Sequence, residues 1–517
     1  MSLGRMAAPV VMVVALLFWS ACGQVYRPVV IPCSSGGVPG CPVETNPAPA
    51  NFHSVLGVST NSPGYSGGAM QIDVSGDSIV GETTLSPASA PNTGQNPTHL
   101  AVAPGDSRVF VATAGSVFPG GTDSIASFSP VFQSTLSSGL GSVTSILLPT
   151  GSQPVFVNTT QTNAVYVANF GSGSVPSSIG EINTNLNVLA NTAVLGASAN
   201  PVSLAEMPNG MKIYSANQGN NTVSSLNTVD LSQNVVTGFT GVNPVWAVAR
   251  GDSQKIYVVT EGDGQLVTID TASDTVTSSL PVGAGANFIF FDPNLNRLYV
   301  VNPVTAMVYV FSDTGGIANG GVSDVPLQLA VIPFAAKSPS CFSGCTPVSV
   351  TALLDGTRFY VASYQTAASC PDPVIGTGSA CVIPGLTVFD ANTFAVEYPT
   401  APTLTLLTWP PFATNQYAVP PVTSCASPVF PALYTPSATR FRVFTVAAED
   451  SSRVFVSMCD AGAIAVIDTT NSNANNSGTG QSADTLVVDL PAADAASGVQ
   501  VNGQPLPQNP TFLIMGQ

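Results

Sequence analysis

Few residues in this 517-residue chain are of the types that carry out covalent or acid–base chemistry. The segment GYSGG, residues 64–68, matches the G-x-S-x-G pattern that presents a nucleophilic serine. That pattern requires a strand-to-helix turn beneath an oxyanion hole, whereas Ser66 stands between two expected strands, where glycine serves turn geometry. We therefore expect Ser66 to be a turn residue and assign no catalytic residue.

The chain has two histidines, His53 and His99. A Ser-His-acid triad needs a histidine beside the nucleophile, and His53 only begins the expected folded region. His99 falls within an expected strand, where it is either a packed residue or a ligand contact in a central channel. Because the chain also has no CxxC pair, the sequence predicts no zinc site.

Acidic turns offer a second kind of chemistry. The segments EGDG (261–264) and DVSGD (73–77) could supply carboxylates to calcium, but neither has the ligand spacing of a known loop. No phosphate-cradling glycine loop opens a helix, so we expect no cofactor. With 12 Lys plus Arg against 28 Asp plus Glu, the chain also has no basic surface for nucleic acid.

The first residues have the pattern of a targeting segment. Arg5 precedes the apolar run 6–18, and WSAC (19–22) follows where cleavage occurs. Ser-Ala before Cys22 resembles the lipobox of bacterial lipoproteins, which implies lipidation of Cys22 and, with Gly23 next, transfer to the outer membrane. An ordinary cleaved signal peptide is the alternative, since Trp19 stands where an aliphatic residue is usual.

The remaining cysteines support export. An even number of cysteines in an exported chain is typical of disulfides. Closeness in sequence suggests three pairs, and the fourth follows by elimination, although sequence does not prove connectivity. The expected pairs are Cys33–Cys41, Cys341–Cys345, Cys370–Cys381 and Cys425–Cys459.

Composition divides the chain into three parts. After the targeting segment 1–22, residues 23–52 are rich in Pro, Gly and Ser and resemble a tether. From 53 to 517, short β-branched and aromatic runs alternate with Gly, Asn, Asp and Pro turns, as in an all-β domain. No segment shows the 3.6-residue period of an amphipathic helix.

These runs form a four-part repeat. A first strand that often opens with Pro leads into a second such as KIYVVT (255–260) or RLYVVN (297–302). Third strands such as QLVTID (265–270) and fourth strands such as DTVTSSL (274–280) follow. Repeats of roughly forty to fifty residues with four strands each are typical of a β-propeller.

The repeat count and the two ends of the chain predict a closed ring. The N-terminal repeat lacks a first strand, and the C-terminal NPTFLIMGQ echoes NPTHLAVAPG from Asn96, so we expect Pro510–Gly516 to complete that blade. Closure removes exposed sheet edges. The number of repeats predicts eight blades, or seven if the degenerate stretch 396–439 does not belong to a blade of its own. The expected second strands lie at Val55, Val109, Val165, Ile213, Ile256, Leu298, Phe359 and Val454.

The repeats VYVAN, IYVVT, LYVVN and AVIDT resemble the YVTN-type β-propeller repeat. This repeat is common in exported bacterial proteins and related to propellers of the lactonase family. The resemblance covers nearly everything after His53. It implies the fold, and it raises a lactonase-like hydrolase as an alternative function.

Insertions interrupt the repeat after second and fourth strands, at 365–381, 331–345 and 398–439. In a propeller both connections emerge on one face, and rigidly mounted loops are where recognition is expected. The longest insertion carries Trp409, Phe412 and Tyr417, which are either partner anchors or the small core of an ordered loop. The other binding candidates at this face or in the channel are Tyr364, Glu261, Asp460 and His99.

Together these patterns predict a monomeric, non-enzymatic lipoprotein of the cell envelope, held in the membrane by its lipid alone. Its propeller would bind a protein or glycan through a disulfide-braced loop face. The alternatives are a lactonase-like hydrolase and a purely structural envelope component.

Overall fold

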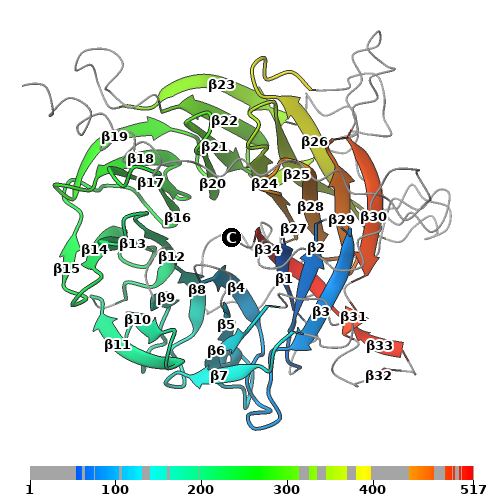
Figure 1. The fold of residues 1–517 in the computed structure, drawn as a ribbon. Coiled ribbons are helices and arrows are strands. Elements are labelled where there is room, and N and C mark those ends of the chain that lie inside the picture. Colours follow the sequence, from blue (N-terminus) through cyan, green and yellow to red (C-terminus); the bar gives the residue numbers. More distant parts are fainter. Residues whose placement is uncertain are drawn as a thin grey trace, which may run out of the picture.

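The computed structural model is a ring of antiparallel sheets around a central axis (Figure 1). Apart from the 3₁₀ turn Gly115–Val117, the elements of the described residues are strands, which confirms the all-β propeller. The structure describes residues 54–60, 65–74, 76–103, 108–130, 140–159, 164–196, 198–313, 325–334, 345–368, 380–396, 425, 442–470, 484–491, 493–494, 500–501 and 504–515.

Each blade runs from an innermost first strand to an outer strand at the rim (Figure 1). Blade 1 contains β34 (Asn509–Met515), β1 (Ser54–Thr60), β2 (Gly68–Asp73) and β3 (Ser78–Thr84). Blade 2 contains β4 (Pro97–Val102), β5 (Val109–Ala114), β6 (Asp123–Phe128) and β7 (Thr144–Leu147). Blade 3 contains β8 (Pro154–Asn158), β9 (Ala164–Asn169), β10 (Ser178–Asn183) and β11 (Val188–Val194). Blade 4 contains β12 (Pro201–Glu206), β13 (Lys212–Asn217), β14 (Thr222–Asn227) and β15 (Gln233–Val235).

The second half of the ring has the same plan. Blade 5 contains β16 (Pro244–Ala249), β17 (Lys255–Thr260), β18 (Gln265–Asp270) and β19 (Thr275–Pro281). Blade 6 contains β20 (Phe288–Asp292), β21 (Arg297–Asn302), β22 (Met307–Ser312) and β23 (Leu327–Pro333). Blade 7 contains β24 (Thr346–Ala352), β25 (Arg358–Ala367) and β26 (Cys381–Asp390). Blade 8 contains β27 (Val443–Ala447), β28 (Arg453–Met458), β29 (Ala463–Asp468) and β30 (Thr485–Pro491).

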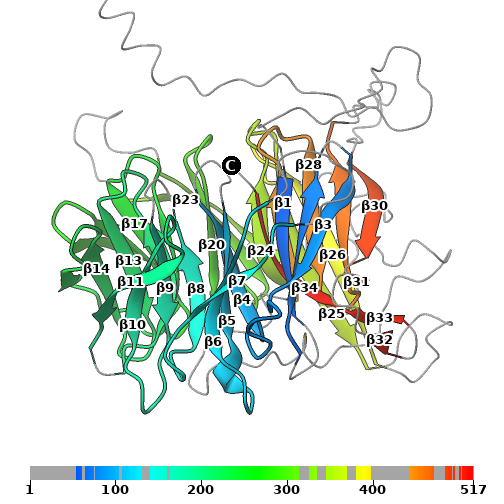
Figure 2. The same ribbon diagram turned by 60° about the horizontal axis from the view of Figure 1, so that its bottom comes forward.

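The described residues thus form eight blades, and the alternative count of seven is wrong. Blade 7 shows three strands in its described part. A fourth strand would start at Val396, which forms a β-bridge with Phe389 of the third strand. In blade 5, Val276 of the fourth strand pairs with Ile269 of the third in the same way. A small separate sheet of β31 (Ala493–Asp494), β33 (Gln504–Pro507) and β32 (Gln500–Val501) lies outside the ring (Figure 2).

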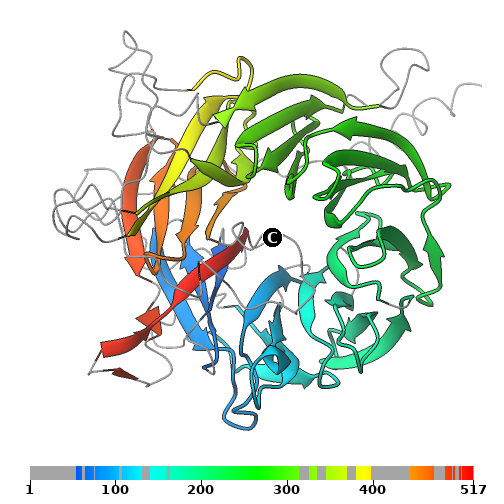
Figure 3. The same ribbon diagram turned by 180° about the vertical axis from the view of Figure 1, so that it is seen from behind.

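The two ends of the chain close the ring, as the sequence predicts. Strand β34 pairs antiparallel with β1, from Val55 opposite Met515 to Thr60 opposite Asn509. Figure 3 shows this C-terminal strand, in red, beside the blue N-terminal strands. The strand covers Asn509–Met515, one residue earlier than expected at each end. The residues expected to be a targeting segment and a tether, 1–52, lie outside the described part.

Burial between blades explains the unbroken apolar runs of the second strands. In β17 all six residues of KIYVVT are buried, because one face packs on blade 4 and the other on blade 6. Burying one Val, Ile or Leu side chain contributes about 1.5–3 kcal/mol. Strict alternation of apolar and polar residues is expected only where one face of a sheet meets water.

Polar side chains near the start of the second strands connect neighbouring blades. In blade 4, the first and third residues of β13 are Lys212 and Tyr214, and both bind Asp274 in the turn between β18 and β19 of blade 5. The ammonium lies 3.0 Å from the carboxylate, and the Ser225 hydroxyl donates to it at 2.8 Å. We call this contact, from one blade to the turn between third and fourth strands of the next, a blade joint.

Three further blade joints contain a buried or partly buried ion pair. Arg250 lies 2.9 Å from Asp313, which also accepts from the Tyr257 hydroxyl, between blades 5 and 6. Arg358 and Tyr360 both bind Asp484, at 2.6 Å and 3.0 Å, between blades 7 and 8. Between blades 8 and 1, Arg453 forms two hydrogen bonds to Asp77, at 2.8 Å and 3.0 Å. The ring is therefore closed by side chains as well as by strand pairing.

The joint between blades 5 and 6 yields a stability prediction. Replacing Asp313 by Asn removes the negative charge that faces Arg250, and the two side chains are 2% and 6% exposed. We expect the free energy of unfolding to fall by about 3 kcal/mol, because the buried guanidinium loses its buried counter-charge and keeps only the exposed carboxylate of Asp252. Urea unfolding followed by circular dichroism measures this change.

Asp252 provides the matched control. It binds the same guanidinium at 2.8 Å, but its own side chain is 45% exposed. Solvent screening limits such a pair to about 0–1 kcal/mol, so Asp252→Asn should cost much less than Asp313→Asn. Equal losses in the two variants would contradict the assignment of the buried pair as the structural one.

The joint between blades 4 and 5 yields a pH prediction. Burial alone would raise the pKa of Asp274, but hydrogen bonds from Tyr214, Lys212 and Ser225 lower it below its ordinary value. A carboxylate with a lowered pKa stabilises the fold above its unfolded pKa of about 4, and this contribution is lost as pH falls through the folded pKa. Asp274→Asn should therefore destabilise the protein more at neutral pH than at pH 2.5, as measured by urea unfolding at both pH values. A pH-independent difference would contradict the joint's ionic character.

Candidate functional site

One face of the ring carries the connections from second to third strands and from each fourth strand to the next blade. We call it the loop face. The 3₁₀ turn Gly115–Val117 and the far end of the β25–β26 hairpin project from it, at the lower side of Figure 2. The opposite face, which we call the turn face, carries the turns between first and second and between third and fourth strands.

The β25–β26 hairpin extends beyond the regular blade. Both strands have ten residues, against six in β17 and β18. Their pairing continues from Tyr364 opposite Pro384 to Ala367 opposite Cys381. The expectation that the 365–381 segment is wholly an insertion is therefore wrong at its two ends, where strand pairing continues.

Beside this hairpin, a disulfide attaches the longest insertion to blade 8. Cys425 is bonded to Cys459, with the two Cα atoms 5.8 Å apart, which confirms the pair expected by elimination. Cys459 directly follows β28, and its carbonyl accepts from the Asn509 side-chain amide at 2.8 Å. The disulfide therefore lies beside the strand that closes the ring.

Arg442 connects two of the sequence candidates at the same place. Its guanidinium donates to both carboxylate oxygens of Asp460, at 2.6 Å and 2.9 Å, and lies over the Tyr364 ring at 4.9 Å from its centre. The Arg442 carbonyl also accepts from the Cys459 backbone N–H at 3.0 Å. We call Tyr364, Arg442, Asp460 and the Cys425–Cys459 disulfide the brace.

Arg442 was missed by sequence reasoning because it lies at the end of an irregular stretch. It stands two residues before Phe444, where Pro97 stands before His99 and Pro244 before Trp246. The signal available in the sequence was that Arg442 occupies the position at which other blades have the proline that opens the first strand.

The other candidates lie elsewhere or outside the described residues. Glu261 is in the β17–β18 turn of blade 5, on the loop face but not in the brace, and its carbonyl accepts from the Gly285 N–H at 2.7 Å. Cys345 is disulfide-bonded and Cys381 is buried. Trp409, Phe412, Tyr417, Cys22, Cys33, Cys41, Cys341 and Cys370 are not among the described residues.

Ser66 has a structural environment. Its hydroxyl donates to the Thr93 carbonyl at 2.8 Å, and its backbone bridges Gln95. No strand-to-helix turn surrounds it within the described part of the chain. In addition, no group of three His, Cys, Asp or Glu side chains among the described residues could hold a metal ion.

Aromatic side chains converge on the axis of the ring. Six innermost strands place an aromatic residue at the same register, and the rings make a closed circuit. Successive ring centroids are 3.7 Å, 5.3 Å, 5.1 Å, 5.7 Å, 4.4 Å and 4.2 Å apart. In circuit order the residues are His99, Phe156, Trp246, Phe288, Phe444 and Phe512, which we call the axial aromatic cluster.

This cluster places His99 among packed aromatic rings. His99 is 6% exposed and lies between Phe156 and Phe512. The two remaining innermost strands carry Ser203 and Ser349 at the same register, and their hydroxyls accept from the backbone N–H groups of Ala247 and Thr445. The small serines leave room for the large rings of the adjoining blades to meet.

Removing the disulfide of the brace yields a prediction. The Cys425→Ser, Cys459→Ser double variant frees a loop with a sequence separation of 34 residues. Loop-closure entropy predicts a loss of about 3–4 kcal/mol in the free energy of unfolding, measurable with urea. Reduction of the wild-type protein should give a loss at least as large, because it also opens the disulfide of Cys345, and an unchanged midpoint in the double variant would contradict the structural role.

The comparisons with known proteins identify neighbours by shape only. No protein-family model matches the chain, and no curated protein matches its sequence. The described part of the chain also has no helix that is long and apolar enough to span a membrane.

Three of the similar solved structures are of bacterial proteins. A putative 6-phosphogluconolactonase from Bacteroides uniformis is 14% identical over 67% of this chain and 94% of its own, with a TM-score of 0.45. One from Bacteroides fragilis is 10% identical over 91% and 100%, with a TM-score of 0.44. Hydrazine synthase of Kuenenia stuttgartiensis is 13% identical over 67% and 88%, with a TM-score of 0.43. Similarity at this level says nothing about activity, and the fold rests on the sheets described above.

Proposed function

We propose that this protein is a non-enzymatic propeller that binds a protein or glycan through its loop face. The observation that carries the proposal is the brace, which fixes the longest insertion to the inner strands of blade 8 on that face by a disulfide and an ion pair. Two ion-pair partners that are 6% and 4% exposed hold their geometry firmly. Loops mounted on a rigid scaffold are the usual recognition elements of such folds.

The chemistry of the ring axis supports binding rather than hydrolysis. A hydrolase on this scaffold would need ionisable groups that converge near the axis. The described innermost strands instead present the apolar rings of the axial aromatic cluster, and its one imidazole is packed between two phenyl rings. The Arg442 and Asp460 charges of the brace neutralise each other.

The proposal includes a cellular location, the cell envelope. The targeting pattern that ends at Cys22, the even number of further cysteines and the YVTN-type repeats support an exported lipoprotein of the cell envelope, which we expect to be the outer membrane. A lipid anchor at Cys22, followed by the Pro- and Gly-rich residues 23–52, would hold the ring near the membrane surface.

Substitution of the aromatic residues of the insertion tests whether the insertion binds the partner. We expect the triple variant Trp409→Ala, Phe412→Ala, Tyr417→Ala to bind its partner at least tenfold more weakly, because aromatic anchors dominate interface energy at about 2 kcal/mol or more each. The expected propeller, residues 53–517, would be screened against a glycan array and against cross-linked envelope proteins of its source. The dissociation constant of each hit would then be measured by surface plasmon resonance.

Val229 supplies the matched control. It is 90% exposed on the turn face, so Val229→Ala removes apolar surface from the opposite side of the ring. This variant should bind the partner with wild-type affinity. Wild-type affinity in the triple variant, with unchanged urea unfolding, would contradict recognition through the insertion.

A further inference from the structure

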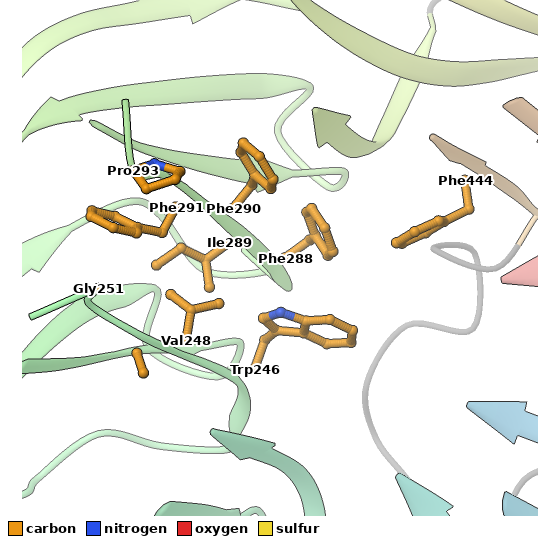
Figure 4. Close-up of a pocket in the computed structure, with 10 residues that line it drawn as sticks. Trp246, Val248, Gly251, Phe288, Ile289, Phe290, Phe291, Pro293 and Phe444 are labelled. Carbon is orange, nitrogen blue, oxygen red and sulfur yellow. The ribbon is translucent and has the colours of Figure 1, made fainter. Parts of the chain in front are cut away.

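A pocket of about 400 Å³ lies between the innermost strands of blades 5 and 6 (Figure 4). Trp246 and Val248 from β16 form one wall, and Phe288 to Phe291 from β20 form the other. Gly251 and Pro293, in the turns that follow these two strands, line the outer part. The pocket therefore runs from the axial aromatic cluster toward the turn face, away from the loop face and the brace.

Aromatic rings close the inner end of the pocket. Trp246 and Phe288 have ring centroids 5.1 Å apart, and Phe444 meets Phe288 edge-on at 5.7 Å. Figure 4 shows these three side chains pointing toward one another, with Phe291, Ile289 and Val248 along the side. Phe291 is itself held by stacking on Tyr257, with centroids 6.1 Å apart. The inner surface is thus fixed by the core.

The pocket walls are apolar at a register where two other innermost strands carry polar side chains. Val248 and Phe290 occupy the register two residues after the axial aromatic cluster, and both are only partly buried. At that register, Asn158 in blade 3 donates to the Leu204 carbonyl, and Thr351 in blade 7 accepts from the Ala447 N–H. Polar contacts tie those strands to their neighbours, whereas blades 5 and 6 present carbon surface to a cavity.

The mouth of the pocket is open at Gly251. A Cβ atom added there would meet no heavy atom within 4 Å, and the backbone is not in the left-handed region. Gly251 and Pro293 are both exposed. Because Gly251 lines the pocket, a larger side chain at residue 251 would add bulk at the mouth without straining the fold.

We propose that this pocket binds an uncharged molecule built of two or three aromatic rings. Its volume is within the range of small-ligand pockets, roughly 300–1,000 Å³. Among the residues that the structure describes, no charged side chain lines it, and moving a charge into such surroundings without a partner is strongly unfavourable. A glycan would likewise lose hydrogen bonds to water that these walls do not replace. Flat rings, by contrast, make edge and face contacts with Trp246, Phe288 and Phe291.

An uncharged fluorescent probe, N-phenyl-1-naphthylamine, tests the proposal with the expected propeller, residues 53–517. We expect saturable binding at one site per chain, seen as an increase in fluorescence. The Gly251→Leu variant should bind at least tenfold more weakly with an unchanged urea midpoint. The charged analogue 8-anilino-1-naphthalenesulfonate should bind wild type at least tenfold more weakly than the neutral dye.

Gly173 offers a matched control. A Cβ atom added at this exposed turn of blade 3 would also meet nothing within 4 Å, so Gly173→Leu adds the same side chain away from the pocket. This variant should bind the neutral dye as wild type does. Non-saturable dye uptake, or equal affinity in Gly251→Leu and wild type, would overturn the proposal. Loss of loop-face binding in the triple aromatic variant is a separate measurement, so the two proposals can fail independently.

Discussion

A blade of this protein cannot bury both of its faces by itself, and this constraint shapes the rest of the structure. The second strands are apolar on both sides, so each blade is stable only between two neighbours. Closure of the ring by β34 and β1 therefore satisfies the burial of the first and last blades together. The blade joints serve the same end, since they place the chain's scarce cations at the seams between blades. Lys212, Arg250, Arg358 and Arg453 all bind the carboxylate of a following blade.

The axial aromatic cluster has a consequence for function. Six aromatic side chains pack against one another around the axis in a closed circuit. The loop face and the turn face are therefore separate surfaces. A ligand beside Gly251 and a partner at the brace would contact different ends of the same core, with packed aromatic rings between them.

Periodicity explains why the fold was predictable and the contacts were not. Strand order, ring closure and the Cys425–Cys459 pair follow from local repetition and from counting, and the structure confirms them. The joint between Arg453 and Asp77 links residues 376 positions apart, and nothing local to either residue indicates the other. The axial aromatic cluster was hidden for a different reason. His99 and Phe156 are adjacent only because the same register in successive blades faces the axis. The brace depends on Arg442, whose surroundings in the sequence break the repeat.

The turn between third and fourth strands shows how one backbone position serves different joints. Asp77, Leu231, Asp274 and Phe394 occupy equivalent places, and their φ angles are 47°, 54°, 52° and 57°. A left-handed conformation costs a residue other than glycine about 1–2 kcal/mol, so the turn geometry is required whatever the side chain does. The type of side chain at this position depends on the residue that it meets on the preceding blade. Aspartate stands opposite Lys212 and Arg453, whereas Phe394 meets Arg297 through its ring, with the guanidinium 5.4 Å from the ring centre. Leu231 is buried opposite a strand that begins with Ala164 and has no cation there. The turn builds the blade, and the residue that it presents fits the side chain that the preceding blade offers.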